Sequence, residues 1–364
     1  VNTCMNKDPI YDLAKPWLGE GLFTARYEIW KNDYKLLQPA FSQTILNTFI
    51  DVFNSQSRKL VKELEKNAGK DLFDPFTYLR HNALDNICMT ALGIGFTDSN
   101  LASNYLDAAK STIDTIVERG LKIWWHSSYT FAWSKLKKEQ DAYLKILHEM
   151  SNTVRRQDLM FLFLYKEHVD ILLAAGHETT PNALLFTMVL LGSHPDVQEK
   201  VFSEIKEVVG GDRDVEKTDL SRLQYLEAVL KESMRLFSVV PIIGRKLEKD
   251  VKLKNCTLSS GRHCFLFICG FNNNPLWGPD RHEFKPERWL EPGKVPGNLN
   301  VSAPFGLGRR QCIGKTYAMM LMKTTLAHVV RNYRIKADHT KIRLKFVVTL
   351  KPDDGHYISI EKRM

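Results

Sequence analysis

Residues 169–192, VDILLAAGHETTPNALLFTMVLLG, form an apolar run that constrains the fold more than any other feature of the chain. No other stretch comes closer to a membrane span. However, His177 and Glu178 lie at its midpoint, where a lipid-facing charge would cost roughly 2.5–3.5 kcal/mol. The sequence therefore predicts a helix buried inside protein, which the rest of the chain has to cover. Pro181 is expected to bend this helix.

The remaining pattern is mostly helical. Apolar periodicity and end signals predict helices over 30–66 with a break near Pro39, 136–156, 194–211, 218–236, and from Cys312 to about residue 331. A strand hairpin is expected in 246–271, turning at Ser-Ser-Gly, and a second one closes the chain around Asp-Asp-Gly (353–355). Residues 272–304, rich in Pro, Gly and Asn, are expected to be irregular. Because no repeat or linker divides the sequence, we expect one domain over residues 1–364, mainly α with a small β region.

Charge and aromatic content indicate what the surface contacts. The formal net charge is +9, with Lys and Arg spread along the whole chain. Basic-aromatic repeats are absent, so a nucleic-acid partner is not expected, and the charge favours an acidic protein or anionic lipid. Residues 122–133, KIWWHSSYTFAW, favour a position at a bilayer interface, with a place in the core as the alternative.

Six cysteines, at positions 4, 88, 256, 264, 269 and 312, show no regular spacing. This indicates a reducing compartment and mostly buried thiols. A zinc or disulfide unit built on Cys256, His263, Cys264 and Cys269 is an alternative, although the spacings match none of the usual zinc pairs.

Cys312 lies in the glycine-rich stretch PFGLGRRQCIG, residues 304–314. It directly precedes a predicted helix, whose free N–H groups and positive dipole end would stabilise a thiolate. The glycines allow a tight turn, and Arg309 and Arg310 add positive charge nearby. Two alternatives remain. One is a structural cysteine behind a glycine-rich turn, and the other is a Gly-x-Gly dinucleotide loop, which an irregular segment precedes instead of a strand.

The spacing Phe305-x-x-Gly308-x-Arg310-x-Cys312-x-Gly314 resembles the heme-binding loop of the cytochrome P450 family. This resemblance implies a cytochrome P450 fold that binds heme b. Cys312 would be the axial thiolate ligand of the iron, Arg310 would contact a propionate, and Phe305 would pack near the sulfur.

Two further motifs follow the order of that family. Glu232 and Arg235 form a Glu-x-x-Arg pair, and FKPERW (284–289) is similar to Pro-Glu-Arg-Phe, with Trp289 in place of Phe. Taken alone, the pair would be a solvated salt bridge on a helix surface. The resemblance instead implies a buried ion triad of Glu232, Arg235 and Arg288 that supports the heme side of the fold.

AAGHETT (174–180) is similar to the oxygen-activating motif of the family. The resemblance implies that Glu178 and Thr179 deliver protons and that Ala175 and Gly176 leave space for oxygen. The alternative for Thr179 is a hydrogen bond back to a helix carbonyl. Because position 175 is Ala, the chain lacks the glutamate through which some fatty-acid hydroxylases bind heme covalently.

The stretch from KPWLGEGLF (15–23) to QPAF resembles animal microsomal fatty-acid-hydroxylase-like members, of the family 4 type. It implies that Trp30 contacts a heme propionate, and Arg245, just after VVPIIG, matches the other propionate-binding arginine of the family. An arginine is expected at position 34, where this chain has Tyr34. Lys31 and Lys35 are the candidate substitutes, as point charges without the planar fork of arginine.

The function implied by the resemblance is a heme-thiolate monooxygenase that inserts one oxygen atom of O2 into a lipophilic substrate, such as a fatty acid, terpenoid or xenobiotic. The implied partners are NADPH-cytochrome P450 reductase, cytochrome b5 and a membrane surface, for a monomer on the cytoplasmic face of the endoplasmic reticulum. The apolar pocket is expected to be lined by Ile171, Leu172, Ala175, Val239, Val240, Ile242 and Ile243.

Two departures from the family pattern favour an alternative. Family members carry an amino-terminal anchor, a proline hinge and the first strands and helix of their main sheet, which we expect this chain to lack. Residues 156–169 are also shorter than usual by roughly a few tens of residues, although loops tolerate deletion. A sheet without those strands is expected to expose an edge. The alternative is a truncated, non-catalytic heme- or ligand-binding relic of the same fold.

Overall fold

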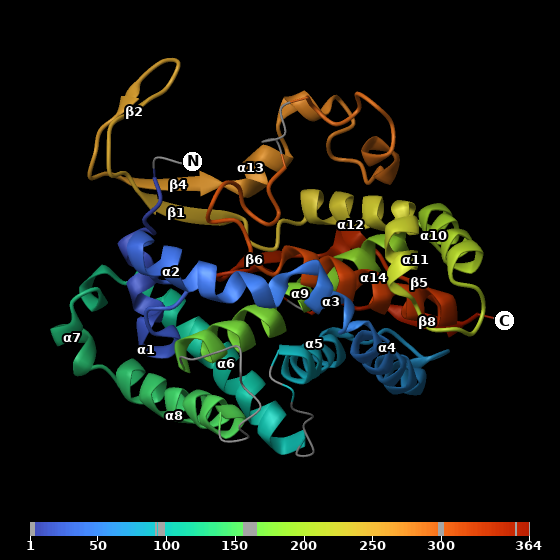
Figure 1. Cartoon of the computed structure of the whole chain (residues 1–364), viewed down its shortest axis with the longest axis horizontal. Coiled ribbons are helices and arrows are strands. Elements are labelled where there is room, and N and C mark those ends of the chain that lie inside the picture. Colours follow the sequence, from blue (N-terminus) through green and yellow to red (C-terminus); the bar gives the residue numbers. More distant parts are fainter. Residues whose placement is uncertain are drawn as a thin grey trace.

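The computed structural model describes residues 4–91, 93, 99–155, 166–297, 302–353 and 355–363. Most regular structure in this part is helical (Figure 1), which confirms the mainly α prediction. The helices are α1 Lys15–Leu18, α2 Tyr27–Leu37, α3 Gln43–Asn47, α4 Ile50–Leu64, α5 Phe76–Ala91, α6 Ser99–Leu121, α7 Ser128–Ala132, α8 Lys135–Arg155, α9 Lys166–Ser193, α10 Pro195–Val208, α11 Lys217–Arg222, α12 Gln224–Leu236, α13 Ile268–Asn272 and α14 Lys315–Asn332. The strands are β1 Ile242–Lys246, β2 Val251–Lys252, β3 Thr257–Leu258, β4 His263–Phe267, β5 Tyr333–Lys336, β6 Leu344–Phe346, β7 Leu350–Pro352 and β8 Ser359–Lys362.

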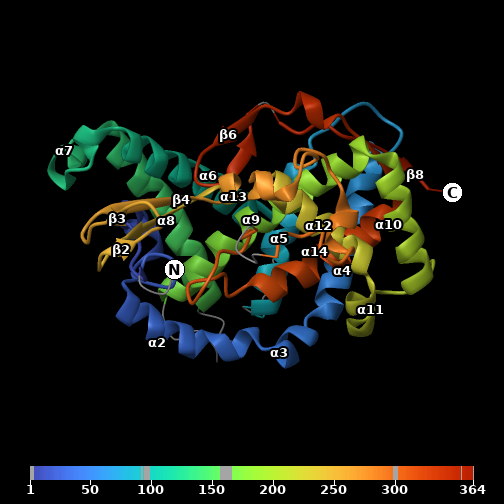
Figure 2. The same cartoon turned by 90° about the horizontal axis from the view of Figure 1, so that it is seen from above.

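Helix α9 is the central element, as its apolar sequence predicts. It packs against α5, α8, α10, α12, α14 and β5 and runs through the middle of the molecule in both views (Figures 1 and 2). His177 and Glu178 are buried within it, and the helix stays continuous through Pro181. The predicted buried helix is therefore confirmed, while its bend stays a prediction. None of the helices in the described ranges combines the length and apolarity needed to cross a bilayer.

The other predicted helices are present, with two further breaks. Residues 30–66 divide near Pro39 as expected, and again between α3 and α4. Residues 218–236 were expected to form one helix but divide into α11 and α12 at Leu223. The reason is a competing cap from α10, because the Glu204 carboxylate accepts hydrogen bonds from the N–H groups of Tyr225 (2.6 Å) and Leu226 (2.9 Å).

The strands of the described residues form four two-stranded antiparallel sheets, β1–β4, β2–β3, β5–β8 and β6–β7. The first hairpin reverses between β2 and β3, whereas Ser-Ser-Gly only links β3 to β4, so the predicted turn is wrong. The turn predicted at Asp-Asp-Gly is also wrong. Residues 347–349 connect β6 to β7, and β8 pairs with β5 instead. Burial explains this choice, because Ile360 of β8 joins Tyr333 and Ile335 of β5 in the core.

Segments from elsewhere in the chain meet the outer edges of two sheets. Lys7 forms an antiparallel bridge to Arg245 of β1, and the N–H of Lys246 donates to the carbonyl of Asn6 at 3.1 Å. Ala68 forms a bridge to Ile360 of β8. Part of the edge expected to be exposed is therefore paired, which limits aggregation through it.

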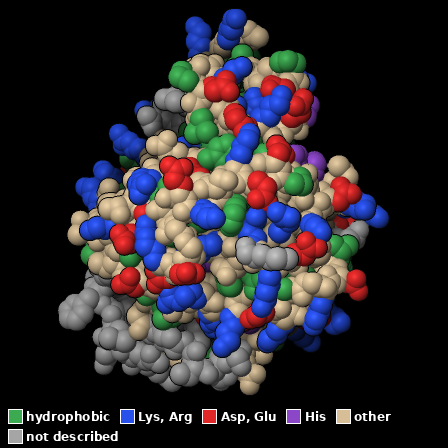
Figure 3. All heavy atoms as spheres, turned by 90° about the vertical axis from the view of Figure 1, so that its right-hand side faces the viewer, with side chains coloured by type: hydrophobic (Ala, Val, Ile, Leu, Met, Phe, Trp, Pro, Cys, Tyr) green, Lys and Arg blue, Asp and Glu red, His purple; other side chains and the backbone are tan. Residues whose placement is uncertain are grey.

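The aromatic segment 122–133 lies largely at the surface. Trp124, Tyr129 and Trp133 are exposed, so the core alternative is wrong for them, while Phe131 is buried. Helix α7 of this segment lies at the end of the molecule opposite the C-terminus (Figures 1 and 2). The face near the C-terminus instead shows acidic and basic side chains interspersed, with little hydrophobic surface (Figure 3).

The close contact between α9 and the end of β5 gives a test of this packing. A Cβ added at Gly192 would lie 2.7 Å from the backbone nitrogen of Ala337, whereas one at Gly211 would meet nothing within 4 Å. We expect Gly192→Ala to lower the free energy of unfolding by about 1–3 kcal/mol, and Gly211→Ala to leave it almost unchanged. Denaturant titration measures both. Equal stability of the two variants would contradict the packing described here.

Candidate functional site

The loop that carries Cys312 is closed by its own backbone, directly before α14. The N–H of Cys312 donates to the carbonyl of Phe305 at 2.8 Å. Gly306 and Gly308 have φ angles of 73° and 72°. A side chain would be strained at both positions, so the turn requires these glycines. The loop therefore holds the sulfur of Cys312 at the beginning of α14.

Cys312 is exposed as a residue, whereas its thiol lies among protein atoms. Burial among surrounding protein atoms raises the pKa of the thiol, although the N–H of Gly314 and the charge of Lys315 act to lower it. Arg309 and Arg310 do not supply the expected charge at the sulfur, because their guanidinium groups bond to Tyr27 and to backbone carbonyls instead. A thiolate here therefore needs a stronger positive partner than the chain itself provides.

Arg310 extends from the cysteine loop to α2. Its guanidinium lies 4.7 Å from the ring centroid of the buried Trp30. Nε donates to the carbonyl of Met5 (3.1 Å) and Nη2 to that of Ala25 (2.8 Å). Nη1 is buried without a hydrogen-bond partner among the described residues. Burial, together with the charge of Arg245, lowers the pKa of Arg310 to about 10.

Two further cations lie near Arg310. Arg245 of β1 is buried and donates from Nη1 to the carbonyl of Gly244 at 3.0 Å. Lys7 lies beside it, and burial and the charges of both arginines lower the pKa of Lys7 well below its usual value. In the part of the chain that the structure describes, none of these three cations has a carboxylate within ion-pair distance. We refer to Lys7, Arg245 and Arg310 as the cation cluster.

The candidate lysine substitutes for the missing arginine do not join this cluster. Lys31 and Lys35 are exposed on α2, and the ring of Tyr34 packs 4.9 Å from that of Trp30. Lys7 takes part instead, and sequence reasoning missed it. No local pattern identifies Lys7, because only the fold brings it to Arg245.

One turn of α9 is accessible to solvent, although most of this helix is buried. Ala175 is exposed and Thr179 is half-buried, and the Thr179 hydroxyl donates to the carbonyl of Ala175 at 2.9 Å. The back-bonded alternative for Thr179 is therefore present. A Cβ at Gly176 would lie 3.2 Å from Ile87 of α5, and the expected role of Gly176 in leaving space for oxygen stays a prediction. Gly176 allows α5 and α9 to approach closely.

Glu178 is tied to the β6–β7 hairpin. Its Oε1 accepts from the Thr349 hydroxyl at 3.0 Å and lies 2.5 Å from Nζ of Lys351. Burial acts to raise the pKa of Glu178, but the charges of Lys351 and His177 keep it below its usual value. Glu178 and Thr179 thus have different partners, and the structure does not bring them together.

The structure brings Glu232, Arg235 and Arg288 together in a buried site. Arg235 donates to both carboxylate oxygens of Glu232 at 2.8 Å, and Arg288 Nε donates to Oε1 at 3.0 Å. Trp289, where the motif has Phe, donates from Nε1 to Oε2 of the same carboxylate at 2.9 Å. This additional donor is a role that the sequence did not predict.

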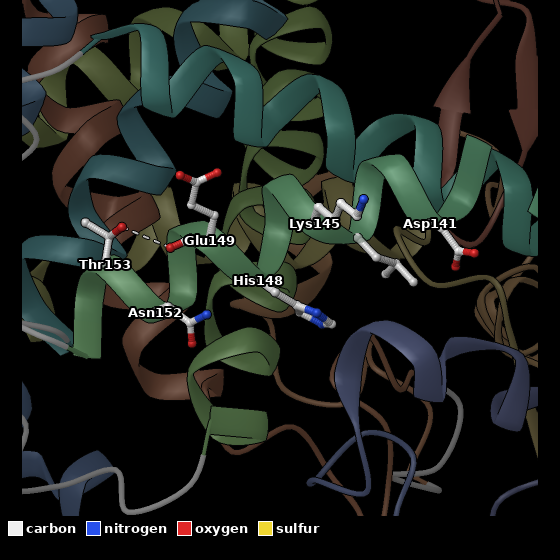
Figure 4. Close-up of a pocket in the computed structure, with 7 residues that line it drawn as sticks. Asp141, Lys145, His148, Glu149, Asn152 and Thr153 are labelled. Atoms are coloured by element: carbon white, nitrogen blue, oxygen red, sulfur yellow. Dashed lines mark hydrogen bonds between the residues drawn. The ribbon is translucent and has the colours of Figure 1, made fainter. Parts of the chain in front are cut away.

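The residues expected to line an apolar pocket divide into two groups. Val240, Ile242 and Ile243 are half-buried, whereas Ile171, Leu172 and Val239 are buried in the core. A separate shallow groove of about 450 Å³ runs along α8, lined by Asp141, Leu144, Lys145, His148, Glu149, Asn152 and Thr153 (Figure 4). No residue of the candidate site lines this groove.

Comparison with known proteins identifies the same family as the motifs. The sequence model of the family "Cytochrome P450" matches residues 3–159 and 137–358. Cytochrome P450 4c3 of Drosophila melanogaster is 31% identical, with 99% of this chain aligned to 76% of that protein. Cytochrome P450 4V2 of Homo sapiens is 31% identical, over 99% of this chain and 77% of that protein. The two matched ranges overlap over residues 137–159, which include most of α8. The predicted shortening at 156–169 begins there, and much of it lies outside the described residues.

The buried carboxylate of Glu232 is expected to be essential for stability. Glu232→Gln leaves Arg235 and Arg288 without their counter-charge and should lower the free energy of unfolding by about 3–5 kcal/mol. Trp289→Phe removes one hydrogen bond and should cost about 1 kcal/mol. Glu291→Gln, in an exposed pair with Lys294, is the control and should change stability by less than about 1 kcal/mol. Denaturant unfolding measures all three variants. An equal loss of unfolding free energy in Glu291→Gln and Glu232→Gln would contradict the buried triad.

Proposed function

Because the chain belongs to the cytochrome P450 family and is a monooxygenase of that kind, we propose that it inserts one oxygen atom of O2 into a lipophilic substrate with electrons from NADPH. The observation that carries this proposal is the position of Cys312, an exposed residue whose backbone the loop fixes at the start of α14. Family membership implies heme with a cysteine thiolate ligand, and Cys312 is the residue that we assign to the iron.

Two observations support the fit of heme to these residues. The raised pKa of the Cys312 thiol means that a thiolate requires a nearby positive centre, which heme iron supplies. The cation cluster, with the orphaned Nη1 of Arg310, requires negative charge, which the two propionates supply. Arg310, Arg245 and Trp30 would hold the propionate side, and Phe305 and Gly308 would shape the loop around the sulfur.

When bound, heme supplies the oxidising chemistry, which electron donation from the thiolate promotes. In α9, Ala175 is exposed and would leave room beside a bound heme, and Thr179 holds a hydroxyl proton at Oγ1. Glu178 stays ionised because Lys351 binds it, so proton transfer from Glu178 toward Thr179 requires the carboxylate first to leave Lys351 and to take up a proton from water. The apolar side chains of Val240, Ile242 and Ile243 favour a lipophilic substrate such as a fatty acid, terpenoid or xenobiotic.

The electron donor that fits this surface is acidic. Arg309 and Lys315, which flank Cys312 in sequence, are both exposed, and the chain carries a formal net charge of +9. NADPH-cytochrome P450 reductase is the proposed partner of a monomeric enzyme, with cytochrome b5 as a second donor.

The exposed aromatic segment supports a position on the cytoplasmic face of the endoplasmic reticulum membrane. Ile123, Trp124, Tyr129 and Trp133 are all more than 60% exposed. Tryptophan and tyrosine place an apolar ring and a polar tip at the headgroup level. The ammonium of Lys122 lies 4.3 Å from the ring centroid of Trp125 and pairs with Glu118, so the aromatic rings themselves provide the contact with lipid.

Carbon monoxide binding tests the assignment of Cys312. The heme-loaded, reduced protein is expected to give the difference spectrum of a thiolate-ligated heme, and Cys312→Ala to abolish it. Cys256→Ala, which removes another exposed thiol, should leave the spectrum unchanged. If the wild-type chain took up no heme, this would support the non-catalytic relic. If the thiolate spectrum survived in Cys312→Ala, a residue other than Cys312 would be the iron ligand.

Vesicle binding tests the membrane-facing segment. Trp124→Ala and Trp133→Ala should each weaken binding to phospholipid vesicles by about tenfold, because each removes a large apolar surface from the interface. Leu276→Ala, at an exposed residue outside this segment, is the matched control and should bind as wild type. Equal vesicle affinity of all three variants in a sedimentation assay would refute this orientation.

A further inference from the structure

We propose that Lys7 supplies the third cation for the heme propionates, in place of the arginine that the family pattern expects at Tyr34. This assignment rests on the proposed function, because it presumes that the chain binds heme. It concerns a residue outside every motif of the sequence.

The backbone fixes Lys7 beside the other two cations. Lys7 forms an antiparallel bridge to Arg245 of β1. The carbonyl of the preceding residue, Asn6, accepts a hydrogen bond from the N–H of Lys246 at 3.1 Å. The Asn6 side chain also accepts the N–H of Tyr27, the first residue of α2, at 2.7 Å. The carbonyl of Met5 binds Arg310. This short segment therefore connects the cysteine loop, β1 and α2, and its position does not depend on side-chain flexibility.

The ammonium of Lys7 has aromatic neighbours but no anion. Nζ lies 4.4 Å from the ring centroid of Tyr11 and 4.9 Å from that of Phe23. Aromatic faces attract a cation but leave its charge in place. Because Arg245 and Arg310 act on the same ammonium, the cluster brings together three positive charges, one buried and two half-buried, with no carboxylate within ion-pair distance among the described residues. Such a cluster is unfavourable unless a ligand brings negative charge, and two carboxylates would provide it.

The other lysines do not match this environment. Lys31 and Lys35 are exposed to solvent on α2, where water screens their charge. Tyr34 packs its ring against Trp30 and contributes no charge. Lys7 alone among these lysines is half-buried and lies near both arginines.

The rate of heme loss tests the assignment of Lys7 directly. With excess apomyoglobin as the acceptor, we expect Lys7→Met to release heme about 10- to 100-fold faster than wild type, because a charge-assisted contact is lost. Lys7→Arg should restore slow release. Lys31→Met and Lys35→Met are the matched controls and should release heme at the wild-type rate. The heme-free Lys7→Met protein should unfold at a higher temperature than the heme-free wild type, because it holds one fewer uncompensated charge.

Heme dimethyl ester, which lacks the propionate charges, separates this role from a purely structural one. With the ester, wild type and Lys7→Met should release the ligand at similar rates. Equal release of heme b by the two proteins would overturn the assignment of Lys7, as would an undiminished difference with the ester. Failure of the wild-type chain to take up heme would overturn the proposed function together with this inference. If Lys7→Met does not fold, the release rates of heme b and heme dimethyl ester are compared between Lys7→Gln and the wild type instead.

Discussion

Burial of Glu178 in the middle of α9 is the constraint on which the rest of the structure depends. A carboxylate inside an apolar helix needs a partner, and Lys351 of the C-terminal hairpin provides it. The pair therefore attaches the end of the chain to its central helix. The same helix is closed against α5 at Gly176 and open at Ala175, so one side of α9 serves packing and the other faces the candidate site.

A second constraint is electrostatic and involves the other side of the site. The chain does not supply enough positive charge to stabilise a thiolate at Cys312, nor enough negative charge to balance the cation cluster. One requires a positive partner and the other a negative one, so a ligand with a metal centre and two carboxylates satisfies both at once. The fold thus fixes the positions of the Cys312 thiol and of the cation cluster, which need partners of opposite charge. A bound group that supplies both charges would therefore stabilise the folded protein.

The sequence predicted the parts of the site that lie in local motifs. The glycines around Cys312 have the backbone angles that a tight turn requires, and Glu232 meets Arg235 because helical spacing dictates it. Long-range contacts were not predictable in the same way. Lys7 reaches the site through pairing with β1, and the bond from Trp289 to Glu232 depends on the path of an irregular segment.

Errors in the fold have the same origin. The C-terminal strand pairs with β5 because burial of Ile360 outweighs a local turn signal, and the break at Leu223 depends on a carboxylate of the preceding helix, Glu204. X-ray absorption at the iron edge of the heme-loaded protein tests the assignment of Cys312 to the iron most directly. We expect one sulfur ligand to iron, absent in Cys312→Ser. An iron coordinated only by nitrogen and oxygen in the wild-type protein would contradict it.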